Sequence, residues 1–434
     1  MPVIATLGSL HQQSITGVLK FQGYWLGQFN NAGYGFSYFD STASQYIIGN
    51  PVANISTLAV VNSGTIYNSG LDTPNVYGNI SNTGTIAQTF GAGYLGNTST
   101  VQKASFVNVF KSPNVGTRLT HFSSAFTGGI SGGPQSVTSQ IANTAYVAGT
   151  ALHRALQLPG VGYVMKITNN TKTWATNLYP VGNAAITATF TTTTMNLCNG
   201  VPIAAGKFNG QYSNAVVIDN GYVSALNATT GAITWVKAYV SGSTKIYPTA
   251  PIQTGSTMFF TGANTYSGTP TYLIAASPTT GNTTASRLMN STITRIYPDP
   301  ASTSNLYVQI NNNDFIKMTT SFTILYQRRF IDAGGIGITG ITGDTGSNIF
   351  INSGNVVMKA PSNGAIPGTG SYTLISNSYT YANIDGTYSS TASNVASANS
   401  LINSNSGYDP GYTATSYVVT EPAGITISAA VITI

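Results

Sequence analysis

The sequence predicts an all-β fold: a β-propeller of about seven blades, each a four-stranded antiparallel sheet, with a small C-terminal β extension. Three observations lead to this prediction. Short apolar runs alternate with polar turns, one run-and-turn pattern recurs at steps of 59, 50, 43 and 41 residues, and helical periodicity is almost absent. Repeats of about 40 to 50 residues with about four strands each are typical of propeller blades, because one such sheet cannot bury both faces alone.

The central stretch 214–239 carries the clearest copy of the repeat. We expect Asn220-Gly221 to form a two-residue hairpin turn, because both residue types tolerate a positive φ. A second turn follows at 227–231, where Gly231 is free to adopt the left-handed conformation, and a strand carrying Trp235 comes next. These elements predict a three-stranded meander within one blade.

Other copies of the repeat lie on both sides of this stretch. In each copy an apolar run precedes an aromatic or valine position, and a polar turn follows it. These positions are Tyr163, Tyr222, Tyr272, Phe315 and Val356. A second marker supports the repeat, since Thr244-Lys245-Ile246-Tyr247-Pro248 recurs 50 residues later as Thr294-Arg295-Ile296-Tyr297-Pro298. Two independent markers that share one step indicate a true internal repeat.

Residues 225–235, Ala-Leu-Asn-Ala-Thr-Thr-Gly-Ala-Ile-Thr-Trp, resemble the blade motif of quinoprotein-type (PQQ-like) propellers. In that motif an acidic or amide residue, a Thr-Gly turn and a Trp recur along each blade. Trp174 belongs to the only other copy that keeps the Trp, whereas 277–281 keeps only the turn. The resemblance implies the propeller fold alone. A bound quinone would require axial acid and amide residues and a Ca²⁺ site that the sequence does not supply, so we expect no cofactor.

The composition favours a protein that assembles with others. Charged residues make up only 6% of the chain, against roughly 25% in an ordinary soluble domain. A surface of Thr, Ser, Asn, Gln, Gly and Tyr is typical of extracellular and virion proteins. Because few long charged side chains lose freedom when such surfaces pack, large polar interfaces cost less to form. The start, Met1 to Gly8, also resembles the N-termini of structural proteins of marine tailed bacteriophages.

Several binding classes are disfavoured. The net charge of +6 is spread along the chain, and Arg328-Arg329 is the only adjacent basic pair, so we expect no nucleic-acid binding. No apolar run approaches the roughly 20 residues of a membrane helix, so we expect no membrane insertion. The single cysteine, Cys198, excludes an intrachain disulfide, and we expect it to be a small buried side chain.

Catalytic signatures are missing from the sequence. The ten acidic residues form no Asp-x-Asp or Glu-x-x-His pair, and five of them are expected at turns: Asp40, Asp72, Asp219, Asp299 and Asp314. The three histidines lack the spacing of metal ligands: His11, His121 and His153. Gly129–Gly133 has the Gly-x-Ser-x-Gly spelling of a nucleophile elbow, but no helical pattern follows it, so we interpret it as a turn. We therefore predict that the protein is not an enzyme and holds no metal.

Three regions are predicted along the chain. Residues 1–22 form an N-terminal arm or first strand, and 23–365 form the propeller. Residues 366–434 have a polar, Ser- and Asn-rich texture, and two interpretations stay open: a closing blade, or a separate β module that mediates oligomerisation. We favour the module, because the apolar end 425–434 would not remain exposed alone.

Tyr247 and Tyr297 are the candidate surface-binding residues. Each precedes a proline at the same point of its blade, and exposed tyrosines of this kind would stack against sugar rings. In the alternative interpretation, their repeated position reflects repeated packing between blades.

Together these observations predict a non-enzymatic structural virion protein of a tailed bacteriophage, a tail, fibre or baseplate component assembled in the host cytoplasm. The expected partners are other virion subunits, further copies of the chain in a homo-oligomer, and a glycan on the host surface. Two alternatives stay open: a secreted or cell-surface bacterial adhesin with a propeller, and a PQQ-like propeller enzyme.

Overall fold

The computed structural model is built from strands and turns, and no helix occurs among the residues it describes. The described residues are 11–15, 18–27, 33–40, 45–52, 66–67, 76–80, 85–95, 102–111, 115–123, 133–141, 144–153, 158–168, 171–180, 189–211, 217–299, 301–332, 337–343, 348–353, 356–366, 368–374, 377–399, 402–405, 413–418 and 430–433.

The strands follow one another as antiparallel meanders, which we label sheets A to G in chain order. Sheet A contains β1 (His11–Ile15), β2 (Val18–Gly27), β3 (Gly33–Asp40) and β4 (Gln45–Val52). Sheet B contains β5 (Ile66–Tyr67) and β6 (Val76–Ile80), which both pair with β7 (Thr85–Leu95), then β8 (Gln102–Lys111) and β9 (Val115–Ser123). Sheet C contains β10 (Gly133–Ile141), β11 (Thr144–His153), β12 (Leu158–Thr168) and β13 (Thr171–Pro180).

The remaining sheets carry the clearest repeats of the sequence. Sheet D contains β14 (Thr189–Cys198), β15 (Val201–Gln211), β16 (Val217–Leu226) and β17 (Ile233–Ser241). Sheet E contains β18 (Thr244–Thr254), which also pairs with β17, then β19 (Thr257–Ala263), β20 (Tyr272–Ala276) and β21 (Thr283–Met289). Sheet F contains β22 (Ile293–Pro298), β23 (Asn305–Ile310), β24 (Asp314–Thr319) and β25 (Ile324–Asp332). Sheet G contains β26 (Ile338–Gly343), β27 (Asn348–Ser353) and β28 (Val356–Pro361).

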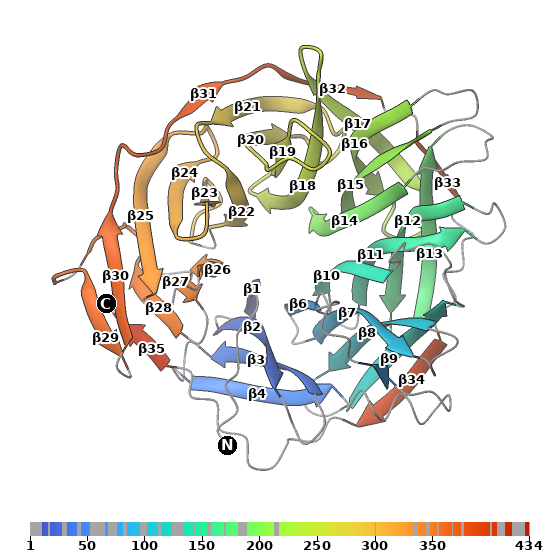
Figure 1. The fold of residues 1–434 in the computed structure, drawn as a ribbon, viewed down its shortest axis with the longest axis horizontal. Helices are drawn as coiled ribbons and strands as arrows, with labels where there is room; N and C mark the ends of the chain where they lie inside the picture. The colour runs from blue at the N-terminus through green and yellow to red at the C-terminus, as the bar shows by residue number, and fades with distance from the viewer. Residues whose placement is uncertain are drawn as a thin grey trace.

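The sheets stand side by side around a common axis (Figure 1). In each sheet one of the earliest strands lies nearest the centre, as β1, β6, β10, β14, β18, β22 and β26 do, and the later strands lie progressively outward. This radial arrangement of antiparallel sheets is a β-propeller, and the predicted fold class is confirmed.

Strands in the middle of sheets C to F are buried on both faces, which explains the continuous apolar runs of their sequences. In β19, Phe259 belongs to the core cluster between sheets E and F, whereas Met258 and Phe260 belong to the cluster between sheets D and E. Successive side chains of a strand point to opposite faces, so a sheet that is covered on both sides needs apolar residues at every position. In β23, likewise, Val308 faces sheet E and Tyr307 faces sheet G.

The predicted hairpin turn at Asn220-Gly221 is wrong. β16 runs unbroken through both residues and pairs with β15 along its whole length. Gly221 meets a different need, since a Cβ there would lie 2.4 Å from Pro248 Cδ and 2.6 Å from the carbonyl oxygen of Ile246. The glycine therefore allows sheet D to approach the first strand of sheet E closely.

The predicted turn at 227–231 is confirmed. Gly231 adopts a φ of +73°, and its N–H donates a hydrogen bond to the carbonyl oxygen of Asn227 at 2.8 Å. The Asn227 side chain accepts hydrogen bonds from the N–H groups of Thr229 and Thr230, at 2.9 and 3.0 Å. An asparagine at the start of the turn thus bonds to the backbone of the residues that follow it.

The structure describes parts of both the predicted N-terminal arm and the predicted C-terminal region. Described residues of the predicted arm, 11–15 and 18–22, lie in β1 and β2 of sheet A. The described strands of the predicted C-terminal region lie along the outer edges of six sheets. These strands are β29 (Ser371–Leu374), β30 (Asn377–Asn383), β31 (Ser390–Ala392), β32 (Val395–Asn399), β33 (Ile402–Asn405), β34 (Thr413–Val418) and β35 (Ala430–Thr433).

Candidate functional site

The two candidate binding tyrosines lie on the first strands of neighbouring sheets. Tyr247, on β18, is only 4% exposed, and its ring meets Tyr266 edge to face with 6.0 Å between ring centres. Tyr297, on β22, is half-buried, and its hydroxyl donates a hydrogen bond to Gln309 Oε1 at 2.9 Å. Burial raises the pKa of the Tyr297 hydroxyl. Both side chains contact other residues of this protein, and their surface-binding role stays a prediction.

A repeated contact joins the last strand of one sheet to a turn of the next sheet. The indole N–H of Trp174, on β13, donates a hydrogen bond to the carbonyl oxygen of Ala228 at 3.2 Å, and Thr176 Oγ1 donates to that of Gly231 at 2.6 Å. A Cβ added to Gly231 would lie 2.6 Å from the Trp174 ring. We call this arrangement, an aromatic ring against a turn glycine with hydrogen bonds to turn carbonyls, the docking contact.

The docking contact recurs between sheets D and E. The indole N–H of Trp235 donates a hydrogen bond to the carbonyl oxygen of Pro278 at 3.1 Å, and the Tyr239 hydroxyl donates to that of Gly281 at 2.8 Å. Gly281 has a φ of +70°, and a Cβ there would lie 2.6 Å from the Trp235 ring. The Thr-Gly turn and the Trp that the sequence analysis identified therefore bind to each other across sheets.

Tyr326 makes the same contact between sheets F and G. Its hydroxyl donates a hydrogen bond to the carbonyl oxygen of Ser362 at 3.1 Å, and Lys317 Nζ donates to the same oxygen at 3.0 Å. Gly364, with a φ of +79°, has no space for a Cβ, which would lie 2.7 Å from the Tyr326 ring. The docking contact therefore does not depend on tryptophan.

The junction between sheets E and F departs from this pattern. Ala285 occupies the register position that Trp235 holds in sheet D, so a methyl group replaces the indole. The turn after β24 instead carries Phe322, which is 5% exposed and has a φ of +70°. The Arg287 guanidinium lies 5.4 Å from the centre of this ring. At this junction the turn supplies the aromatic side chain.

Charge is concentrated on sheet F. This sheet and its connecting turns contain the following ion pairs of described residues: Lys317–Asp299 at 2.9 Å, Arg328–Asp385 at 2.9 Å and Arg329–Asp314 at 2.6 Å. Only 6% of the residues of the chain are charged, so these ion pairs bring together a large share of the described charges.

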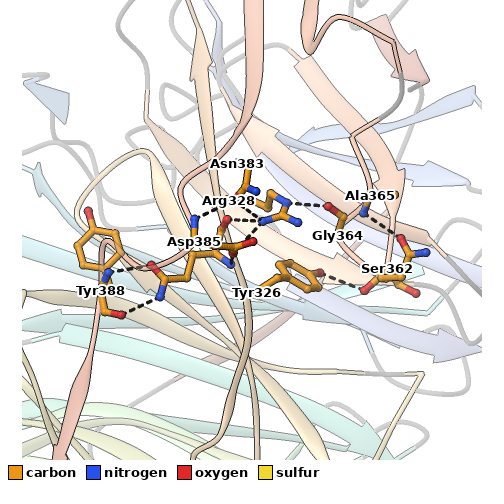
Figure 2. A network of polar contacts seen from close by, with 10 residues as sticks. Tyr326, Arg328, Ser362, Gly364, Ala365, Asn383, Asp385 and Tyr388 are labelled. Carbon is orange, nitrogen blue, oxygen red and sulfur yellow. Dashed lines mark hydrogen bonds and ion pairs between the residues drawn. The ribbon is translucent and has the colours of Figure 1, made fainter.

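Arg328 connects three separate segments (Figure 2). Its Nε donates a hydrogen bond to the carbonyl oxygen of Gly364 in the turn of sheet G, at 2.6 Å. One terminal nitrogen donates to the carbonyl oxygen of Gln327 and to the side chains of Asn383 and Asp385, at 2.6, 3.1 and 2.9 Å. The side chain is buried, so these partners replace the water that the guanidinium would otherwise bind.

Gln327 and Tyr388 hold the chain that leaves sheet F. Gln327 Nε2 donates a hydrogen bond to the Tyr388 carbonyl oxygen at 2.7 Å, and the Tyr388 N–H donates to Gln327 Oε1 at 2.8 Å. The Tyr388 hydroxyl donates to Asp314, a carboxylate that also accepts two bonds from Arg329, at 2.6 and 2.7 Å. Hydrogen bonding to Asp314 raises the pKa of Arg329, and burial raises that of Tyr388.

We call the residues of these two paragraphs that lie on sheet F or in 383–388 the anchor cluster: Asp314, Gln327, Arg328, Arg329, Asn383, Asp385 and Tyr388. All their described polar contacts are made with other residues of the chain. These hydrogen bonds and ion pairs can hold residues 383–388 against sheet F. From the sequence alone, Arg328-Arg329 is only a basic pair and Asp314 is expected at a turn. The clustering of charged residues in a charge-poor chain is the sequence signal that points to this cluster.

Other sequence candidates have the following positions. Cys198 is buried as predicted, and burial raises the pKa of its thiol to about 12. Asp299 accepts a hydrogen bond from the N–H of Ala301 at 3.1 Å, as expected for a turn aspartate. Residues 129–132 and the side chains of the three histidines lie outside the described residues. Among the described residues there is no group of three or more His, Cys, Asp or Glu that could hold a metal ion, and no helix with the length and apolarity needed to cross a membrane.

Comparisons with known proteins concern only the fold. No family model matches the chain, and no curated protein does. Similar solved structures include the Cps50 (Swd1) β-propeller domain of Myceliophteria thermophila, at 8% identity and a TM-score of 0.43 over 81% of this chain and 95% of that chain. Others are the Pan2 WD40 domain of Neurospora crassa, at 8% and 0.39 over 88% and 90%, and apo AztD of Citrobacter koseri, at 10% and 0.35 over 94% and 99%. The fold assignment rests on the strand pairing of this chain itself.

Proposed function

We propose that the chain is a non-enzymatic structural protein that serves as a rigid platform in a larger assembly. More specifically, we propose a virion protein of a tailed bacteriophage, located in a tail, fibre or baseplate. The docking contact is the observation that most directly supports the proposal of a rigid platform. Neighbouring sheets bind each other through aromatic rings and backbone carbonyls, so the platform does not depend on surface charge to stay assembled.

The low charge of the chain supports contact with other subunits. Interfaces made by Thr, Ser, Asn and Tyr side chains are screened little by salt, because they carry few net charges. They also lose less side-chain entropy on packing than interfaces rich in Lys and Glu. We therefore propose homo-oligomers and neighbouring virion subunits as partners, and a host-surface glycan as a further partner.

A particle preparation tests the virion proposal. Particles purified from the source culture by density gradient are washed in about 1 M salt, where the Debye length is only about 3 Å. We expect mass spectrometry to find the chain in the washed particles, at a ratio to the major capsid protein that the salt wash does not change. Recovery of the chain only with the cell envelope or the medium would contradict the virion role.

The adhesin alternative is supported by the same low content of charged residues. It requires that the isolated chain bind a glycan, which a glycan array with purified full-length protein measures directly. The enzyme alternative predicts turnover that is lost when one carboxylate is replaced. Asp314 and Asp299 are the buried carboxylates to replace first among the described residues.

A further inference from the structure

The C-terminal strands run around the outside of the ring of sheets. β29 pairs with β30, and β30 pairs with β25 of sheet F. The chain then passes sheets E, D, C and B in that order, where β31 pairs with β21, β32 with β17, β33 with β13, and β34 with β9. Finally β35 pairs with β28 of sheet G. Figure 1 shows this path in orange and red outside the other strands.

The directions of these pairings indicate one continuous course. The strands from β30 to β34 are all antiparallel to the fourth strand of the sheet they join, whereas β35 is parallel to β28. Sheet G contributes only three strands of its own, and β28 is its third. The third and fourth strands of a meander run in opposite directions. A chain that keeps one direction around the ring, and is antiparallel to the fourth strand of each sheet, is therefore parallel to the third strand of sheet G.

Two of these strands lie on either side of the place where the first and last sheets of the ring meet. Sheet A, built from the N-terminal strands β1 to β4, lies between sheets G and B (Figure 1). Among the described strands, no backbone pairing joins sheet A to a neighbouring sheet, and β1 instead packs against β6 and β26. β34 on sheet B and β35 on sheet G attach one chain segment on both sides of sheet A.

The segment is held at a few defined points. The anchor cluster holds it at Tyr388, between β30 and β31. Further on, Ser286 Oγ donates a hydrogen bond to the Ser393 carbonyl oxygen at 2.7 Å and accepts one from the Val395 N–H at 3.2 Å. Val395 is 6% exposed and packs in the core cluster between sheets D and E, whereas most other side chains in 389–398 are exposed or half-buried. Backbone pairing therefore makes the larger part of the attachment.

We propose that the six described strands β30 to β35, which we call the strap, hold the ring of sheets closed by pairing with sheets on both sides of sheet A. The strap joins sheets that are far apart in the sequence, so it restricts the freedom of the ring to open. It also pairs the outer edges of six sheets, whose free N–H and C=O groups would otherwise accept a strand from another chain. Loosening the strap on one sheet should therefore loosen sheets far from that point.

Hydrogen–deuterium exchange on the full-length protein tests this inference. Ser397 and Ala398 of β32 lie opposite Tyr239 and Ala238 of β17. Alternate residues of a strand direct their N–H toward the partner, so Ser397→Pro with Ala398→Pro removes at least one N–H that faces β17. We expect exchange to rise at least about tenfold in β17 and also in β9, β28 and β1, while β19 and β23 keep their protection. The control, Ser397→Ala with Ala398→Ser, keeps both N–H groups. Like the proline variant it removes the hydrogen bond that Ser397 Oγ accepts from the Thr283 N–H at 3.3 Å, so away from Thr283 it should exchange like the original protein.

An exchange increase confined to β17 and β32 would overturn the inference, because the strap would then have only local effects. Should the proline variant not fold, a disulfide provides a second test. Val240 and Ala396 lie directly opposite each other, so Val240→Cys with Ala396→Cys, in a Cys198→Ala background, places two thiols at bonding range. We expect the oxidised protein to run as a monomer and to exchange more slowly in β9 and β28 than the reduced protein. Covalent dimers, or no change in β9 and β28, would overturn the intramolecular strap.

Discussion

Trp235 donates its indole N–H to the carbonyl oxygen of Pro278 at 3.1 Å, although the two residues belong to different sheets and are 43 positions apart. The ring that makes this bond also leaves no space for a side chain at Gly281. A turn that the sequence shows only as a connection between two strands is therefore also a contact surface for the neighbouring sheet. Its glycine is required twice, once by the positive φ and once by the ring.

The two requirements can be separated with a matched pair of glycines. Gly281 and Gly242 have φ values of +70° and +60°, but an added Cβ at Gly242 meets no atom within 4 Å. We expect Gly242→Ala to lower the free energy of unfolding by about 1 kcal/mol, the cost of the left-handed conformation. Gly281→Ala should cost about 1 to 3 kcal/mol more, because the Trp235 ring must move. Urea unfolding followed by fluorescence measures both, and equal losses would contradict the docking contact.

Phe322 offers the opposite comparison, since a large side chain occupies a position with a φ of +70°. Its ring meets Phe259 edge to face, with 5.9 Å between ring centres. Phe322→Ala should lower the free energy of unfolding by about 3 to 5 kcal/mol through lost burial. Phe322→Gly loses the same ring but relieves the backbone, so we expect it to be about 1 kcal/mol more stable than Phe322→Ala. An alanine variant at least as stable as the glycine variant would show that this backbone conformation carries no cost.

The sequence was sufficient for the fold class because the physics that dictates it is local. A strand buried on both faces needs apolar residues at successive positions, as in 258–260, and such a run can be recognised in the sequence alone. Asn220-Gly221 was misread because a glycine that admits a neighbouring sheet looks the same as a glycine that makes a turn. Only the position of Pro248, in the next sheet, distinguishes the two.

The anchor cluster and the strap could not be predicted for a different reason. Asp314 and Tyr388 are 74 positions apart, and nothing near either residue in the sequence indicates the other. The strap pairs mainly through its backbone, so its strands need neither an apolar run nor alternation. A Ser- and Asn-rich segment of this kind therefore carries little signal for its partner strand.

The anchor cluster should respond differently to changes in its two ion-paired partners. Arg328 is buried and bonds to two carbonyl oxygens as well as to Asp385, whereas the Asp385 side chain is 47% exposed. Arg328→Ala should cost about 3 kcal/mol of unfolding free energy, because it leaves buried acceptors without partners. Asp385→Asn should cost less than about 1 kcal/mol, since solvent replaces much of the lost attraction.

A third variant, Arg328→Lys, serves as a control for the charge of the side chain. Arg328→Lys keeps the positive charge but cannot donate from two nitrogen positions of a planar group, so we expect it to be closer to the alanine variant than to the original protein. Denaturant midpoints at low and high salt give the measurement. A lysine variant with unchanged stability would mean that the positive charge alone, rather than the two donor nitrogens of the guanidinium group, connects sheet F to the turn of sheet G.

Alkaline pH should destabilise the folded protein in a defined window. Burial raises the pKa of Cys198 from 9.0 to about 12, so the folded state favours the protonated thiol. Its contribution to stability is fully present below pH 9 and is lost as the pH rises from 9 toward 12, because the unfolded chain releases this proton first. Burial also raises the pKa values of Tyr239, Tyr307 and Tyr326, which act in the same direction. We expect the urea midpoint to fall steadily above pH 9, and Cys198→Ala to show a shallower fall over the same range. A midpoint that stays constant to pH 11, or an alanine variant with an identical slope, would contradict a thiol held protonated by the core between sheets D and E.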